Sequence, residues 1–133
     1  MLSLLEYIEL GYISKKQLDL IEKYLDGLFA QLGIDVEFSK HFLDRLNDAR
    51  NGKQIIAQEL VSLFNKEFQK YGKIIAQLGP DKEAVLTDLS SNINAPVALE
   101  WNSKTKKLEM IAKTVMRKKN FYSKAGSRQF KVR

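Results

Sequence analysis

The sequence lacks the residues that most often build covalent or metal-bound sites: its 133 residues include no cysteine and one histidine. Disulfides and thiolate metal ligands are therefore excluded, and a multi-histidine zinc site cannot form within one chain. No apolar run approaches the roughly 20 residues that span a bilayer. Glu6 and Glu9 interrupt the N-terminal segment where a secretory signal needs an apolar stretch. We therefore predict a cytoplasmic protein with no metal, no cofactor and no membrane contact.

Positive charge is concentrated near the C-terminus. Residues 104–133 contain 11 lysines and arginines and one acidic residue, Glu109, whereas residues 1–103 contain 11 basic and 15 acidic residues. Clustered lysine and arginine side chains bind phosphates by displacing counterions. The sequence thus predicts a polyanionic partner, and among polyanions it favours nucleic acid, with RNA ahead of DNA. It leaves the oligomeric state open.

Helical periodicity predicts three helices in the first part of the chain. Ser14 and Gln17 have the spacing of a capping box, and Gly33 is a typical C-terminal stop for the helix that follows them. Residues 34–38 alternate apolar and acidic side chains, which fits a short strand or an extended lead-in. The helices are expected over 14–32, about 40–50 and about 57–77.

The apolar period then changes from 3.6 to 2, which indicates strands. Strands are expected over 83–88, 97–101 and 108–117, with a loop over 90–96, a hairpin turn over 102–105 and a candidate edge strand over 130–132. Helices followed by strands predict an α+β fold, with two or three helices packed on one face of a three- to four-stranded antiparallel sheet. The predicted parts are an N-terminal helical segment (1–33), an α+β core (34–121) and a basic C-terminal tail (122–133).

His41 and Arg45 lie four residues apart on a predicted helix, so their side chains share one face. An imidazole transfers protons near neutral pH, and a guanidinium binds a phosphate through two hydrogen bonds. These are the groups that metal-free RNA cleavage needs: one takes the 2′-hydroxyl proton, and cations stabilise the charge on the phosphate. The competing interpretation is that a surface histidine beside an arginine is structural or incidental.

Arg117 ends the long return strand and is followed by two lysines. The period of 2 places Thr114 and Arg117 on opposite faces unless a bulge intervenes. This basic run either binds a phosphate backbone or is a solvated strand end, and Tyr122 either stacks on bases or pins the tail to the body. The residues predicted to bind nucleic acid are Arg50, Lys118, Lys119, Tyr122, Lys124 and Arg128. The carboxylates of Asp81, Glu83 and Asp88 match no metal-binding spacing, so no metal ligand is predicted.

Three stretches, 36–51, 92–96 and 112–121, are similar to small proteins of large tailed phages, including phages of marine bacteria. The similarity covers about residues 33–121, and that family has no established activity to carry over. The resemblance implies a phage-encoded protein that acts in the host cytoplasm or is associated with the virion.

More distantly, the chain resembles the RelE and BrnT toxin-like ribonucleases. BrnT-like chains have an early His and Arg on a helix and a late strand ending in Thr-x-x-Arg, which His41, Arg45, Thr114 and Arg117 match here. The resemblance implies an RNA-binding protein with an endoribonuclease-like fold, in which His41 is the general acid or base and Arg45 and Arg117 stabilise the phosphate without a metal.

Two alternatives stay open. The first is a nucleic-acid-binding or virion-associated protein without enzymatic activity, which would use the same basic residues. The second is a protein-interaction module in which the helix over 14–32 docks on a partner or on a second copy through Leu25 and Phe29.

Overall fold

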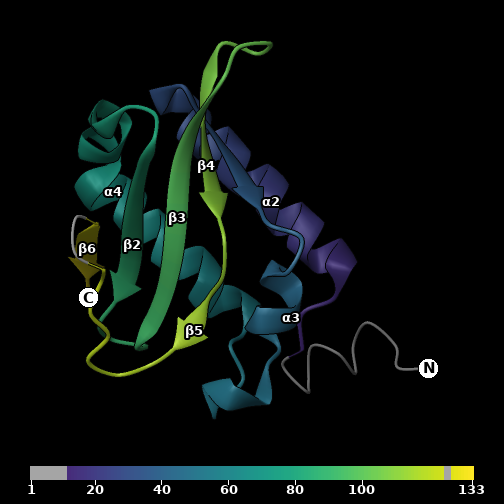
Figure 1. Ribbon diagram of the computed structural model, residues 1–133. Coiled ribbons are helices and arrows are strands. Elements are labelled where there is room, and N and C mark those ends of the chain that lie inside the picture. Colours follow the sequence, from purple (N-terminus) through teal and green to yellow (C-terminus); the bar gives the residue numbers. More distant parts are fainter. Residues whose placement is uncertain (1–11, 125–126) are drawn as a thin grey trace.

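The computed structural model describes residues 12–124 and 127–133, so residues 1–11 of the predicted N-terminal segment lie outside the described part. The fold is α+β, as predicted, with helices behind one sheet (Figure 1). The helices are α2 (Lys15–Phe29), α3 (Phe42–Leu46) and α4 (Ala57–Leu78), with the 3₁₀ helices η1 (Ala30–Leu32) and η2 (Ala49–Asn51). The strands are β1 (Ile34–Phe38), β2 (Lys82–Asp88), β3 (Ile93–Asn102), β4 (Lys107–Ala112), β5 (Met116–Arg117) and β6 (Arg128–Val132).

The sheet has six strands in the order β1-β4-β3-β2-β6, with β5 paired to β3. The pairs β2–β3, β3–β4 and β3–β5 are antiparallel, whereas β1–β4 and β2–β6 are parallel. The predicted sheet of three to four antiparallel strands was therefore too small and wrong in strand direction. Both parallel strands come from segments for which a strand was predicted, 34–38 as a short strand or lead-in and 130–132 as a candidate edge strand, but their partners in the sheet were not predicted. Parallel pairing joins segments far apart in sequence, so no short turn between the two strands indicates that they pair.

Two long helices cover one face of the sheet and confirm the predictions over 14–32 and 57–77 (Figure 1). Ser14 and Gln17 form the predicted capping box at the start of α2. Leu25 and Phe29 of α2 are completely buried in the same core as the apolar face of α4. They are therefore core residues, and the predicted docking of α2 through them is wrong. None of the helices in the described part of the chain is long and apolar enough to cross a bilayer.

Helix α2 also closes the outer edge of the sheet. The Asp26 carboxylate accepts a hydrogen bond from the Val36 N–H at 2.6 Å, and the Glu22 carboxylate accepts one from the Phe38 N–H at 2.9 Å. Both N–H groups belong to edge strand β1, and among residues 12–124 and 127–133 no strand other than β4 pairs with it. Side chains from a covering helix thus satisfy an edge that would otherwise attract another strand.

The predicted long strand over 108–117 is broken opposite Pro96, which lies inside β3 and not in the predicted loop over 90–96. Val97 pairs with Ala112, and Asn94 pairs with Met116, so the β4–β5 side contains one residue more than β3 between these pairs. The Lys113 N–H still donates to the Pro96 carbonyl at 3.0 Å. Proline has no N–H to donate to the neighbouring strand. A bulge commonly accommodates the missing hydrogen bond. The extra residue turns the side chains of β5 to the face opposite the one that strict alternation along β4 would give them.

A carboxyl group without a charged partner lies inside the core. Glu67 of α4 is fully buried, and neither of its carboxyl oxygens forms a hydrogen bond with a described residue. Loss of hydration raises the pKa of Glu67 to about 9, while the Thr87 backbone and the Lys70 ammonium favour the charged form too weakly to offset this. Glu67 is therefore protonated at neutral pH in the folded protein and ionised in the unfolded chain.

Replacing Glu67 should change how stability depends on pH. The folded-state pKa of about 9 lies above the ordinary 4.5, so the carboxyl stabilises the fold fully below about pH 4.5 and loses this contribution as pH rises toward 9. We expect the free energy of unfolding of the wild type to fall, relative to Glu67→Gln, by about 1.4 kcal/mol per pH unit in that window. Urea unfolding at several pH values measures this change in the free energy of unfolding. Asp44→Asn, a substitution on the surface, is the control. Parallel curves for wild type and Glu67→Gln would contradict the assignment.

Candidate nucleic-acid interface

Most of the predicted site residues gather at one end of the sheet, where α3 and η2 meet β5. A hollow of about 420 Å³ is lined there by Arg45, Arg50, Arg117 and Lys118, together with Asp48, Asn51 and Thr114–Met116. Asn51 holds this junction together: its amide nitrogen donates to the carbonyls of Arg45 and Leu46, and its oxygen accepts the Arg117 N–H at 3.1 Å. The sequence marked Asn51 only as a helix breaker beside Gly52, and no pattern around it indicates this role.

His41 does not line the hollow. It is the exposed residue that precedes α3, and its carbonyl accepts the Arg45 N–H at 3.2 Å. The predicted helix over about 40–50 is in fact the five-residue α3 followed by η2. Asp48 breaks the helix because its side chain caps η2 by accepting the Arg50 N–H at 2.8 Å. Of the predicted pair, Arg45 therefore lies on α3 and at the hollow, whereas His41 precedes the helix and lies outside the hollow.

Arg117 is occupied by other protein groups. Its Nη1 and Nη2 atoms each donate to a Glu59 carboxylate oxygen, at 3.0 and 2.7 Å. The same two atoms donate to the Ser91 and Gln54 carbonyls, and Nε donates to the Lys53 carbonyl. A guanidinium has five N–H groups, so all of them are used. Arg117 has no donor left for a phosphate, and we assign it a structural role.

Glu59 provides the matching charge. Its burial alone would raise the pKa of Glu59, but the hydrogen bonds and charge of Arg117 outweigh this and hold that pKa below its ordinary value. Glu59 also accepts the Ile56 N–H in the first turn of α4. The ion pair therefore fastens β5 to the start of α4 in a largely desolvated position.

Arg50 is also paired, although it is exposed. Its guanidinium donates to both Asp48 carboxylate oxygens, at 2.9 to 3.3 Å. These hydrogen bonds lower the pKa of Asp48 to about 2. Arg50 therefore contributes little net charge to the hollow while Asp48 is ionised.

Among the predicted site residues at this end, three exposed cations form no ion pair with any described residue: Arg45, Lys118 and Lys119. The two lysines begin the segment 118–124, which we call the basic loop. Its backbone is fixed from the sheet, because the buried Asn94 amide donates to the Lys118 carbonyl at 3.0 Å and Gln129 donates to the Phe121 carbonyl at 3.0 Å. The backbone of the basic loop is thus hydrogen-bonded to the sheet at two points, and its exposed side chains include Lys118, Lys119 and Tyr122.

The remaining predicted binding residues lie apart from the hollow. Tyr122 of the basic loop is 78% exposed, so it does not pin the segment to the body. Arg128 belongs to β6 and lies over the Phe130 ring, 4.9 Å from its centre. The segment predicted as a tail therefore contributes a strand to the main sheet.

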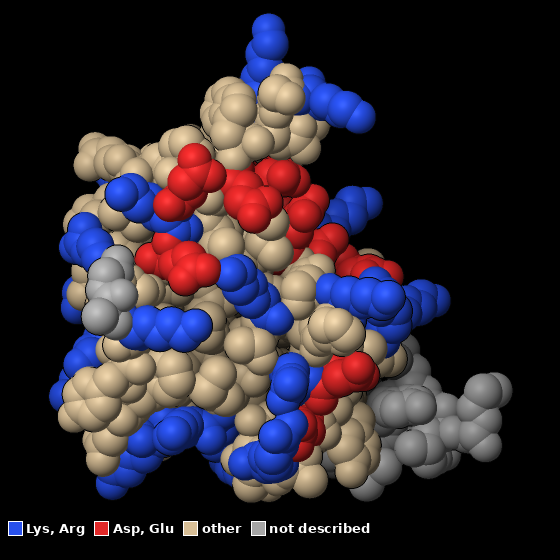
Figure 2. Space-filling view, viewed as in Figure 1, with Lys and Arg blue, Asp and Glu red and all other residues tan. Residues whose placement is uncertain are grey.

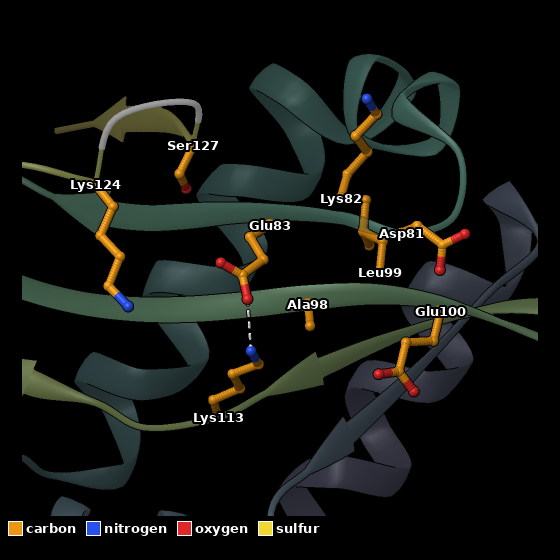
Figure 3. A pocket seen from close by; sticks show the side chains of 9 residues that line it. All are labelled: Asp81, Lys82, Glu83, Ala98, Leu99, Glu100, Lys113, Lys124 and Ser127. Carbon is orange, nitrogen blue, oxygen red and sulfur yellow. Dashed lines mark hydrogen bonds and ion pairs between the residues drawn. The ribbon is translucent and has the colours of Figure 1, made fainter.

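Lys124 lines a second hollow of about 530 Å³ on the face of the sheet away from α4 (Figure 3). Figure 3 shows the 2.7 Å ion pair between Glu83 and Lys113 crossing from β2 to the end of β4, with the Lys124 side chain nearby. Asp81 and Glu100 add further negative charge to the lining. Acidic and basic side chains are mixed here, so this hollow does not select an anion.

Acidic residues gather on the same face, over β1, β4 and β3 (Figure 2). Asp35, Glu109 and Glu100 occupy matched positions on three adjacent strands. A hydrogen bond with Glu109 raises the pKa of Glu37 to about 7, helped by desolvation and by the Glu109 charge. In the described part of the chain, no group of three or more acidic or histidine side chains is arranged to hold a metal ion. The negative charge of this acidic face is unfavourable for phosphate groups over these three strands.

Arg117→Ala should destabilise the fold by about 2–3 kcal/mol, because it leaves the half-buried Glu59 carboxylate without its partner. Arg45→Ala, the same substitution at an exposed position, should change the free energy of unfolding by less than about 0.5 kcal/mol. Urea denaturation measures both. Arg117→Met combined with Glu59→Leu should cost less than Arg117→Ala alone, because no charge is then left unpaired. Equal, small losses for Arg117→Ala and Arg45→Ala would contradict the structural role of Arg117.

Comparison with known proteins places this arrangement in no family. No family model, no curated protein and no solved structure matches the chain. The interface is therefore defined by its own geometry: a basic loop fixed on the sheet, beside a hollow with the unpaired Arg45 at its rim.

Proposed function

We propose that this protein binds single-stranded RNA through Arg45 and the basic loop, without cleaving it. The observation that carries the proposal is the fixed basic loop, in which Lys118 and Lys119 lie close to the highly exposed Tyr122. Lysines neutralise phosphates, and an aromatic ring stacks on an unpaired base whatever its sequence. Single-stranded RNA-binding surfaces combine these two elements.

Pre-organisation of the basic loop supports binding at this place. Ordering a flexible loop on binding costs conformational entropy, which reduces affinity. Here the buried Asn94 and the half-buried Gln129 already hydrogen-bond the loop backbone at two points. The acidic face of the sheet adds orientation, because it disfavours any path of the RNA across β1, β4 and β3.

Cleavage is the less favoured function. The predicted mechanism needs His41, Arg45 and Arg117 around one phosphate, but all five Arg117 donors are bonded to protein groups. His41 lies outside the hollow that Arg45 lines. A general acid or base without a second cation at the phosphate loses most of the stabilisation that the transition state requires.

Removing both loop lysines should weaken RNA binding by about tenfold at low salt and flatten the salt dependence. Each lost phosphate contact on a single strand reduces the slope of log K against log salt by about 0.7, so Lys118→Ala with Lys119→Ala should reduce it by about 1.4. Gel retardation of a labelled single-stranded RNA at several salt concentrations measures both quantities. The matched control is Lys16→Ala with Lys23→Ala, which removes the same charge from exposed positions of α2.

A substitution that should strengthen RNA binding completes this test. Asp48→Asn keeps an oxygen that can cap η2 but releases Arg50 from its ion pair. We expect tighter binding and a slope steeper by about 0.7, since one more cation becomes available to phosphate. Equal weakening by the loop pair and by the α2 pair, with no gain for Asp48→Asn, would show that binding is not localised at this end.

Incubation with labelled single-stranded RNA in EDTA should leave the RNA intact, and His41→Ala should bind it as the wild type does. The reason is that His41 lies outside the hollow that Arg45 lines and that Arg117 is bonded to Glu59. Electrophoresis of the RNA, with analysis of its ends, is the measurement. Products with 2′,3′-cyclic phosphate ends that are made by the wild type and not by His41→Ala would establish a ribonuclease instead.

A further inference from the structure

The hairpin between β3 and β4 projects beyond the helices that cover the rest of the sheet (Figure 1). Asn102 organises its turn. The Asn102 side-chain oxygen accepts the N–H groups of Lys104 and Thr105 at 3.0 and 3.2 Å, and its carbonyl accepts the Lys106 N–H at 2.8 Å. Lys106 completes the turn in the left-handed region, with φ of 57°. The end of the hairpin therefore has a defined backbone, although no helix supports it.

Trp101 lies at the base of this turn. It is on the side of β3 whose earlier residues face the core. Leu99, two residues earlier on that side, is completely buried, but Trp101 is 55% exposed. Its partner across the hairpin is Leu108, which is nearly buried. The chain thus leaves a large aromatic ring half in water where the core ends. Exposed rings of this kind are enriched at binding surfaces, because they bury much area at a small cost in conformational entropy.

Two lysines complete this surface. Lys104 and Lys106 are exposed in the turn, and neither forms an ion pair with a described residue. Lys107 is different, since its ammonium lies 3.7 Å from the Asp35 carboxylate. We name Trp101, Lys104 and Lys106 the hairpin tip. One accessible aromatic ring and two unpaired cations lie there within six residues on a fixed turn.

We infer that the hairpin tip is a second contact for single-stranded nucleic acid, in which an unpaired base stacks on Trp101 while Lys104 and Lys106 bind phosphates. The inference rests on the proposed function and extends it to a second place on the molecule. Stacking requires a free face of a base, and in a duplex the neighbouring bases already cover both faces. The hairpin tip therefore selects single strands.

The two contacts are separate. Lys118 pairs with Asn92 before β3 begins, and the turn starts at Asn102 where β3 ends. Ten residues of strand at about 3.3 Å each place the hairpin tip about 33 Å from the basic loop. Glu100 and Glu109 lie between them on the acidic face. A strand that reaches both contacts must pass around this face, and a very short oligonucleotide reaches only one of them.

Trp101 is the only tryptophan in the chain, so its fluorescence reports on this contact directly. Wild-type protein is titrated with a single-stranded RNA oligonucleotide, with a duplex of the same sequence and with vesicles rich in phosphatidylserine. Retardation of the same RNA is measured in parallel for the wild type, Trp101→Ala and Lys104→Ala with Lys106→Ala. The loop pair Lys118→Ala with Lys119→Ala is included, and circular dichroism verifies the fold of each variant.

We expect single-stranded RNA to quench Trp101 emission over the same concentration range in which it is retarded, and the duplex to quench it far less. Trp101→Ala should weaken binding by about tenfold, the order of magnitude of one lost base stack. The lysine pair in the turn should weaken binding and flatten its salt dependence by about as much as the loop pair does. The loop pair should still show quenching, at higher RNA concentration.

RNA that is retarded without any change in Trp101 emission, and that binds both hairpin variants like the wild type, would overturn the inference and leave the proposed function intact. Quenching by the vesicles alone would assign the hairpin tip to an anionic membrane surface and overturn the inference too. Absence of retardation even at low salt would overturn both the inference and the proposed function.

Discussion

The half-buried ion pair between Arg117 and Glu59 depends on one proline. Pro96 interrupts the ladder between β3 and the returning chain, and the bulge opposite it adds one residue. That residue turns Arg117 to the helix-covered side, where it is level with the buried Ile93 and meets the start of α4. Without the bulge, alternation would leave the guanidinium on the open, acidic face. The position of a single imino acid thus determines whether this cation is structural or available to a ligand.

The same junction determines which charges remain free. Glu59 neutralises Arg117 and Asp48 neutralises Arg50, so the net positive charge at this end comes from Arg45, Lys53 and the basic loop. On the open face, three carboxylates lie side by side on neighbouring strands. The unpaired cations thus lie at one end of the sheet and the three carboxylates on its open face, and separated charges of this kind orient a charged ligand before short-range contacts form. A count of basic residues alone does not show which surface carries the unpaired charge.

Local signals in the sequence predicted the local structure well. The capping box at Ser14 and the two long apolar stripes identified α2 and α4, and the hairpin turn that begins at Asn102 was found from its polar residues. The errors came from long-range pairing. The parallel partners of β1 and β6 leave no trace in nearby sequence, and Pro96 was taken for a loop residue because a central strand rarely tolerates it. The prediction of the candidate site failed for the same reason, because only the fold shows that Arg117 forms an ion pair with Glu59.

The parallel pairing of β1 with β4 has a consequence for how the chain folds. Ile34 and Leu108 pair across 74 residues, whereas β2, β3 and β4 are joined by short turns. Closing a long loop is entropically costly, so contacts of this kind form late and slow the approach to the native state. The antiparallel meander can assemble first and offer β4 as a free edge until β1 arrives. During that interval the exposed strand is the segment most open to pairing with another chain, which makes the speed of β1 docking the protein's main protection against aggregation.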